Sequence, residues 1–131
     1  MALHVKVWKQ REGYFVVSLN GKLDSQTALE CEAKLVPLLD GSAKVVLLDM
    51  SLLDYISSMG VRLVLKTRKA LEAKQSRLIM SNLQPQIAKV FEIAKALPPQ
   101  AIFASVAEAD RYFDVIQRRE IEKQSQAGKL T

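Results

Sequence analysis

The sequence predicts an α/β fold in which a mixed sheet of about five strands packs against about four helices. Apolar, β-prone runs alternate along the chain with segments whose apolar residues recur at helical spacing. Alternation of this kind favours helices packed on a sheet. The chain has 131 residues, of which 49% are hydrophobic and 25% charged, so it is expected to form one compact domain.

The N-terminal part is predicted to be a hairpin followed by a helix. His4–Trp8 and Tyr14–Leu19 are apolar, β-prone runs, and the short segment 11–13 between them contains a glycine. Residues 21–24 are expected to end the second strand. The apolar residues of 25–39 recur at helical spacing and predict the first helix.

The middle of the chain is predicted to be a central strand followed by a second helix. The strand is the unbroken apolar run Val45–Leu48, which ends in residues 49–51. Residues 52–57 are expected to form a loop. The helix is predicted from Ser58 to about Lys74, because it carries one apolar side.

Two further strands and two further helices are expected in the last third. Arg77–Ser81 predicts a strand, and a helix is expected to begin at Pro85. A short strand is predicted over 101–104. The last helix is expected to run from Ser105 to about Phe113.

The polar C-terminal segment is predicted to lie outside the domain. Residues 117–131 lose apolar periodicity, which is typical of a solvated helix extension that frays into disorder. We therefore expect one domain over 1–116 and a polar tail over 117–131.

Composition argues against several classes of function. The net charge of +5 comes partly from the tail, and the basic residues lack the aromatic interleaving of single-strand binders, so we expect no nucleic-acid partner. No apolar run approaches about 18 residues, and the first residues do not resemble a signal peptide, so we expect no membrane insertion and a cytoplasmic protein. The only cysteine, Cys31, is expected to be a buried thiol, and we expect no metal and no cofactor.

Three short stretches resemble the signature motifs of a known family. Gly-Lys-Leu-Asp at 21–24, Val-Val-Leu-Leu-Asp-Met-Ser at 45–51 and Tyr-Ile-Ser-Ser-Met-Gly-Val-Arg at 55–62 resemble motifs of STAS domains, the module of bacterial anti-sigma factor antagonists. The resemblance covers residues 3 to 115, and Ser-Val-Ala-Glu-Ala at 105–109 is similar to the closing pattern of the family.

The resemblance implies a protein that is switched by phosphorylation. Such antagonists bind a serine kinase that sequesters a sigma factor; the kinase phosphorylates one serine at the start of the second helix, and a PP2C-type serine phosphatase restores binding. That serine aligns with Ser58, and Ser57 is the second choice. Asp24 and Asp49 match two acidic positions of the family. The surface implied to bind the partner consists of Asp24, Asp49, Ser57, Ser58, Met59, Gly60, Arg62 and Lys66.

The chemistry of a helix start agrees with this expectation. A helix N-terminus leaves amide N–H groups unpaired and carries a partial positive charge, so a hydroxyl can cap it and a phosphate is tolerated there. Ser57 is interpreted mainly as a cap. Arg62, Lys66 and Lys69 recur at i, i+4 and i+7, which indicates either a merely solvated stripe or one that steers an acidic partner.

Two other functions compete with the switch. The first is a STAS subunit of a transporter ATPase complex or signalling scaffold, in which Ser58 is never phosphorylated. The second is an enzyme with Ser58 as nucleophile, but the sequence has no Gly-x-Ser-x-Gly turn and a single distant histidine, so we expect no enzyme. For the switch, Asp24, Asp49 and Ser58 are expected to converge at one end of the sheet.

Overall fold

The computed structural model describes residues 3–96 and 106–130 and confirms the mixed α/β fold. The strands of the described part are β1 (Leu3–Arg11), β2 (Tyr14–Leu23), β3 (Val45–Ile56) and β4 (Arg77–Ser81). Its helices are α1 (Ala28–Asp40), α2 (Ser58–Ala73), α3 (Pro85–Ala96) and α4 (Val106–Leu130). The expected strand over 101–104 lies outside the described residues.

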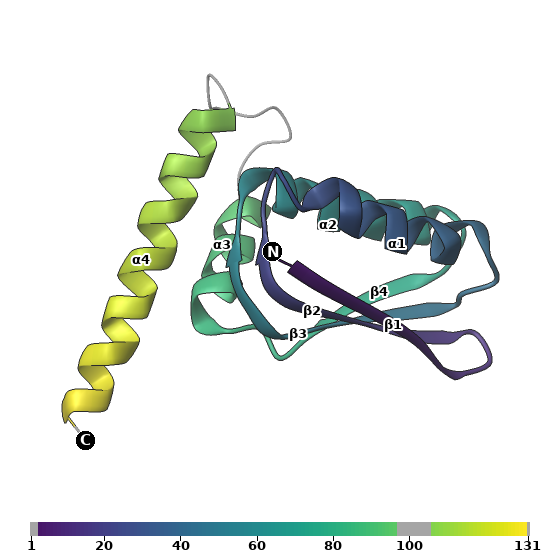
Figure 1. Cartoon of the computed structure of the whole chain (residues 1–131), viewed down its shortest axis with the longest axis horizontal. Helices are drawn as coiled ribbons and strands as arrows, with labels where there is room; N and C mark the ends of the chain where they lie inside the picture. The colour runs from purple at the N-terminus through teal and green to yellow at the C-terminus, as the bar shows by residue number, and fades with distance from the viewer. Residues whose placement is uncertain (1–2, 97–105, 131) are drawn as a thin grey trace.

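The sheet has the strand order β1-β2-β3-β4. β1 and β2 form the expected antiparallel hairpin, while β2 with β3 and β3 with β4 are parallel pairs. Figure 1 shows α1 and α2 lying along one face of the sheet, with α3 and α4 at one end of it. The loops at this end, where the parallel strands finish, are therefore brought close to α4.

The hydrophobic core lies between the sheet and the helices on its covered face. Along β3, Val46, Leu48 and Met50 are buried whereas the residues between them are more exposed, because successive side chains of a strand point to opposite faces. Leu71 of α2 and Cys31 of α1 cover the same interior. The apolar sides of α1 and α2 thus face the sheet.

The central strand extends further than expected. β2 ends at Leu23, within the expected 21–24, whereas β3 continues to Ile56, which still pairs with Leu23 in the parallel register. The prediction that the central strand ends in residues 49–51, followed by a loop over 52–57, was therefore wrong. The Gln84 side chain donates to the carbonyls of Ser51 and Leu53 at 3.1 and 2.9 Å. A residue far along the chain thus satisfies two backbone carbonyls in the extended part of β3.

The last helix is also longer than expected. α4 runs to Leu130 instead of ending near Phe113, so the prediction of its end was wrong. Ala109, Phe113 and Gln117 recur every four residues and are buried, and α4 packs against α3. This contact explains why the helix continues past Phe113. The division of the chain after residue 116 stays a prediction, although Gln117 itself is buried.

Deletion of Arg118–Thr131 is expected to lower the free energy of unfolding by less than about 1 kcal/mol. Ile121 is 50% exposed, so the deleted segment contributes little buried apolar surface through it. Chemical denaturation of the full and shortened chains measures this difference, with Gln117 kept in both. A larger loss would show that the segment is docked on the domain.

Within the described ranges, every helix is too short or too polar to cross a lipid bilayer.

Candidate functional site

The two adjacent serines have different roles at the start of α2. Ser57 is the N-cap residue: its Oγ accepts a hydrogen bond from the Gly60 amide at 3.2 Å, and the side chain is 2% exposed. Its own N–H donates to the Leu23 carbonyl at 2.9 Å, which attaches the helix start to the end of β2. The interpretation of Ser57 as a cap is confirmed.

Ser58 is only partly buried and contacts a residue of α4. Its hydroxyl donates to Asp110 Oδ1 at 2.7 Å, and its backbone N–H donates to the same oxygen at 2.9 Å. The Asp110 carboxylate thus occupies the anion position that an open helix N-terminus offers. A negative group from a distant part of the chain closes the first turn of α2.

The same face of α4 makes two further polar contacts. The Tyr55 hydroxyl donates to Asp114 Oδ1, and the Gln117 side chain bonds both backbone groups of Ile56. Gln117 Nε2 donates to the Ile56 carbonyl at 2.7 Å, and its Oε1 accepts from the Ile56 amide at 3.1 Å. Gln117 is 3% exposed, so these bonds satisfy buried groups.

Several carboxylates surround Tyr55. Burial raises the pKa of the Tyr55 hydroxyl, and Asp114, Asp110 and Asp24 raise this pKa further. Asp24, Tyr55 and Asp114 also line a surface cavity of about 460 Å³, to which Lys22 and Arg118 contribute. The surroundings of Ser58 and Tyr55 are therefore acidic. The two cations near them, Lys22 and Arg118, line the cavity beside Tyr55.

Asp24 lies at the same end of the sheet as Ser58, as expected. It directly follows Leu23, whose carbonyl accepts from Ser57. Its Oδ1 accepts from the amides of Gln26 and Thr27 at 2.9 and 3.0 Å, in the turn before α1. Asp24 therefore shapes this turn and contributes negative charge near Tyr55.

Asp49 does not converge on this site, so the expectation that it joins Asp24 and Ser58 was wrong. It pairs with Ser18 of β2, whereas Ile56 pairs with Leu23, and the five residues from Ser18 to Leu23 span about 16 Å at the usual rise of a strand. The expectation failed because β3 continues beyond Asp49. The Asp49 carboxylate instead accepts from the Ser51 amide at 3.1 Å, and this bond lowers its pKa.

Gly60 is buried at a point where the helix approaches the sheet closely. A Cβ atom on Gly60 would lie 2.8 Å from the Leu23 carbonyl oxygen and 2.8 Å from Ile56 Cγ1. The position therefore requires glycine for packing. The side of α2 that carries Gly60 faces the sheet and is not available to a partner. Its neighbour Met59 is half-exposed and lies beside Ser58 in the same turn.

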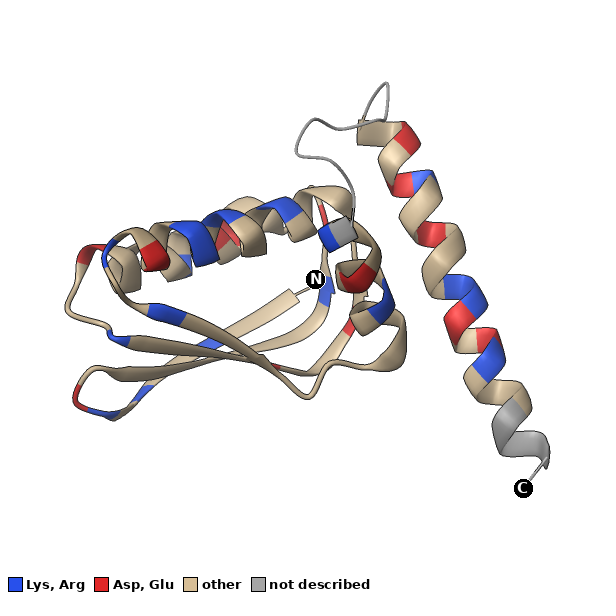
Figure 2. Ribbon diagram, turned by 180° about the vertical axis from the view of Figure 1, so that it is seen from behind, with Lys and Arg blue, Asp and Glu red and all other residues tan. Residues whose placement is uncertain are grey.

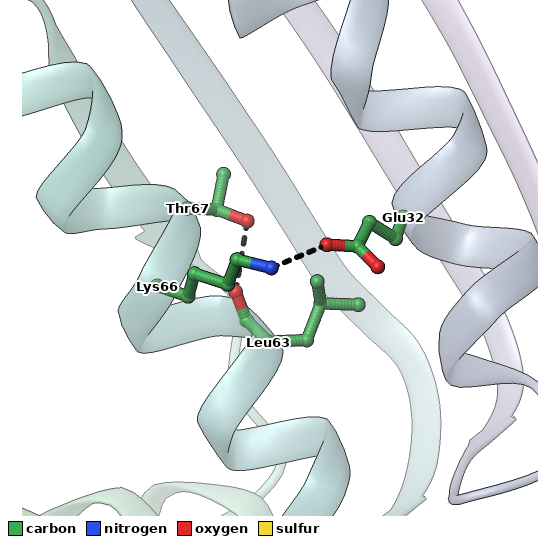
Figure 3. Close-up of polar contacts among 4 residues, drawn as sticks. All are labelled: Glu32, Leu63, Lys66 and Thr67. Atoms are coloured by element: carbon green, nitrogen blue, oxygen red, sulfur yellow. Dashed lines mark hydrogen bonds and ion pairs between the residues drawn. The ribbon is translucent and has the colours of Figure 1, made fainter.

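The basic residues of α2 are exposed but are not equally free. Lys66 Nζ bonds Glu32 Oε2 of α1 at 2.8 Å, as Figure 3 shows. Arg62 and Lys69 are exposed as well. The predicted stripe is thus present, with one of its charges already paired to a carboxylate of the same chain.

The family is shown by the length and position of the sequence match. The STAS domain model matches residues 6–109, which run from within β1 to the start of α4 and include both serines. This chain belongs to the STAS domain family.

Relatives of this STAS domain include anti-sigma factor antagonists. BtrV of Bordetella bronchiseptica, named as a candidate anti-sigma factor antagonist, is 39% identical over 83 residues, covering 63% of this chain and 72% of BtrV. The anti-sigma-B factor antagonist of Staphylococcus aureus is 27% identical over 93 residues, covering 71% of this chain and 85% of the relative.

Solved structures show the same architecture. The anti-sigma factor antagonist SpoIIAA in its unphosphorylated form has a TM-score of 0.65 at 27% identity, covering 70% of this chain and 81% of that structure. The Bacillus cell fate determinant SpoIIAA in the phosphorylated form has a TM-score of 0.61 at the same identity, covering 70% and 83%.

Sequence reasoning missed four residues of the site in this STAS domain. They are Tyr55, Asp110, Asp114 and Gln117. The signal available for the three on α4 is their i, i+4, i+7 spacing, which places them on one helix face. That spacing does not say what the face contacts, so it could not connect them to Ser58.

The site offers hydrogen bonding and charge more than reactive groups. Burial, followed by Glu30 and Glu32, raises the pKa of the Cys31 thiol to about 12, so this thiol is protonated at neutral pH and a poor nucleophile. Among the described residues, histidine, cysteine and carboxylate side chains do not gather in threes that could hold a metal ion.

Proposed function

We propose that this STAS domain is an anti-sigma factor antagonist that binds a serine kinase with anti-sigma activity and is switched off when Ser58 is phosphorylated. The observation that carries the proposal is the Ser58 hydroxyl at the partly exposed start of α2. The names of BtrV and the Staphylococcus aureus relative support an antagonist role. The two forms of SpoIIAA support regulation by phosphate.

Ser58 is a better phosphoacceptor than Ser57 for a geometric reason. The Ser57 side chain is 2% exposed and caps α2, so a kinase would have to break the cap to reach it. Within the part of the chain that the structure describes, the Ser58 Oγ bonds only Asp110. In the reaction this oxygen bonds the γ-phosphorus of ATP, the bond to ADP breaks, and the hydroxyl proton leaves to a base.

The contact surface proposed for the kinase surrounds Ser58. Asp24, Met59 and Arg62 lie at or near the start of α2 and are at least partly exposed, whereas Gly60 acts only through packing. A phosphate there adds about −1.5 to −2 charges at pH 7 to a surface that already holds carboxylates. A PP2C-type phosphatase that hydrolyses the phosphoserine would restore the binding form.

Phosphate transfer to defined variants tests the proposal. A candidate serine kinase is incubated with ATP and the full chain, and the phosphosite is read by mass spectrometry. We expect one phosphate on Ser58 in the unchanged chain and in Ser57→Ala, and none in Ser58→Ala. Phosphate only on Ser57, or none at all from a kinase that binds the chain, would instead favour a STAS subunit that is not switched.

Association with the kinase is expected to slow about tenfold or more as salt rises, if the basic side chains of α2 steer an acidic partner. Arg62→Gln and Lys69→Gln should reduce this salt dependence, and Lys66→Gln should do so less because Lys66 is paired with Glu32. Stopped-flow association rates measure the effect. The matched control is Lys6→Gln, an exposed lysine on β1; an equal effect there would argue against steering by α2.

A further inference from the structure

α4 is attached to the phosphorylation site by polar bonds rather than by apolar packing alone. Asp110 accepts from Ser58, Asp114 accepts from Tyr55, and Gln117 bonds the backbone of Ile56. These three contacts follow one another along a single helix face. The surface that α4 covers is therefore the surface that contains Ser58.

This attachment depends on Ser58 being an unmodified hydroxyl. The Ser58 Oγ–H and N–H are two donors that converge on one Asp110 oxygen, and bonds of this kind to a charged acceptor are among the stronger ones in proteins. Figure 2 shows that acidic bands outnumber basic ones along the N-terminal half of α4. Asp114 and Asp24 add negative charge around the neighbouring Tyr55.

We propose that α4 acts as a clasp: it packs over the start of α2 when Ser58 is unmodified, and phosphorylation of Ser58 releases it. The inference rests on the proposed function in one respect, that Ser58 is the phosphoacceptor. Phosphorylation removes the Oγ–H donor and places about −1.5 to −2 charges next to Asp110. Phosphate and carboxylate then compete for the same helix N-terminus, and the phosphate is covalently attached while the carboxylate is not. Asp110 is therefore displaced.

The basic residues near the site do not restore the attachment. Arg118 lies on α4 itself, but it is eight residues beyond Asp110, about 12 Å along the helix. Arg62 is on α2, the helix that carries Ser58, so its pairing with the phosphate would not hold α4 in place. Arg111 directly follows Asp110 on α4, but neighbouring residues of a helix point to different sides, so Arg111 lies off the face that carries Asp110. The carboxylates on that face are thus expected to repel the phosphate.

Opening the clasp uncovers a surface that the unmodified chain hides. Ala109 and Phe113 of α4 are 7% and 4% exposed, and Gln117 is buried on the same helix face. Movement of α4 away from α3 and α2, the helices it packs against, exposes an apolar helix face and the backbone groups of Ile56. Phosphorylation would then change the shape of the molecule in addition to its charge.

Hydrogen exchange of the full chain tests the clasp without any kinase. Phosphoserine is incorporated at position 58 during synthesis, and exchange is followed by mass spectrometry beside the unmodified chain. We expect amides 109–117 of α4 to exchange about ten- to hundredfold faster in the phosphorylated chain. The amides of β2 and β3 should keep their protection, which shows that the domain remains folded.

Two matched variants separate the clasp from a general effect of charge. Phosphoserine at Ser42, an exposed turn residue before the start of β3, should leave α4 exchange unchanged. Asp110→Asn removes the repelling charge, so phosphoserine at position 58 should then accelerate α4 exchange less. Unchanged or slower α4 exchange in the chain phosphorylated at Ser58, or equal acceleration from Ser42, would overturn the proposal.

The outcome is distinguishable from failure of the proposed function. If no kinase modifies Ser58 but incorporated phosphoserine still frees α4, the clasp stands and the choice of phosphoacceptor fails. If a kinase modifies Ser58 and loses affinity while α4 exchange is unchanged, the antagonist switch stands and the clasp is wrong.

Discussion

Ser58→Asp is expected to weaken the complex with the anti-sigma kinase by about 30-fold to several thousandfold. A charge buried at an interface without a partner costs about 2 to 5 kcal/mol of binding free energy. In this STAS domain the new carboxylate would also face Asp110, which now accepts from the Ser58 hydroxyl at 2.7 Å. The phosphorylated protein should bind more weakly still, because it carries nearly twice the charge. Titration calorimetry with each variant measures the affinities.

Neutral substitutions at the same position are the controls for this result. Ser58→Asn has nearly the shape of Ser58→Asp but no charge, so it should lose much less affinity. Ser58→Ala should keep binding, since it adds no charge and removes only the hydroxyl bond to Asp110, worth about 1.5 to 3 kcal/mol to the fold. Equal affinities for Ser58→Asp, Ser58→Asn and the unchanged chain would contradict the proposed switch.

Gly60→Ala is expected to lower the free energy of unfolding by about 1 to 3 kcal/mol or more. The added methyl group would lie 2.8 Å from the Leu23 carbonyl oxygen and 2.9 Å from Leu23 Cγ, and the first of these is backbone that cannot move aside easily. The start of α2 would have to shift away from β2. Because Ser57 and Ser58 lie in that turn, partner affinity should fall together with stability.

Chemical denaturation of Gly60→Ala beside Met59→Ala measures this effect. Met59 occupies the same turn but is half-exposed, so its truncation should cost much less than the glycine substitution. Similar losses in the two variants would show that the close approach of α2 and β2 is relaxed in solution.

Much of the fold could be predicted because it follows from local patterns. The β1–β2 hairpin, the start of α2 at Ser58 and strand β4 agree with the expected positions. Each is determined by residues close in sequence, through alternating or helical apolar spacing and through turn residues. The capping role of Ser57 is equally local, because its hydroxyl oxygen accepts from the amide of Gly60, three residues further along the chain.

The predictions that failed depended on contacts between distant residues. β3 was expected to end in residues 49–51, but it pairs with β2 as far as Ile56, and Gln84 bonds two of its later carbonyls. That extension carries Asp49 away from the site. α4 was expected to end near Phe113, yet its face toward α3 continues to Gln117.

The sequence by itself determined the STAS fold and the start of α2 at Ser58, since both follow from short motifs and helix-start chemistry. Only the tertiary structure decided what surrounds that serine. Asp110 lies 52 residues from Ser58, and Gln117 lies 61 residues from Ile56. Periodicity shows which side of a helix is apolar, but it does not show which helix start that side will cover. The packing of α4 against α3 and α2 brings these partners together.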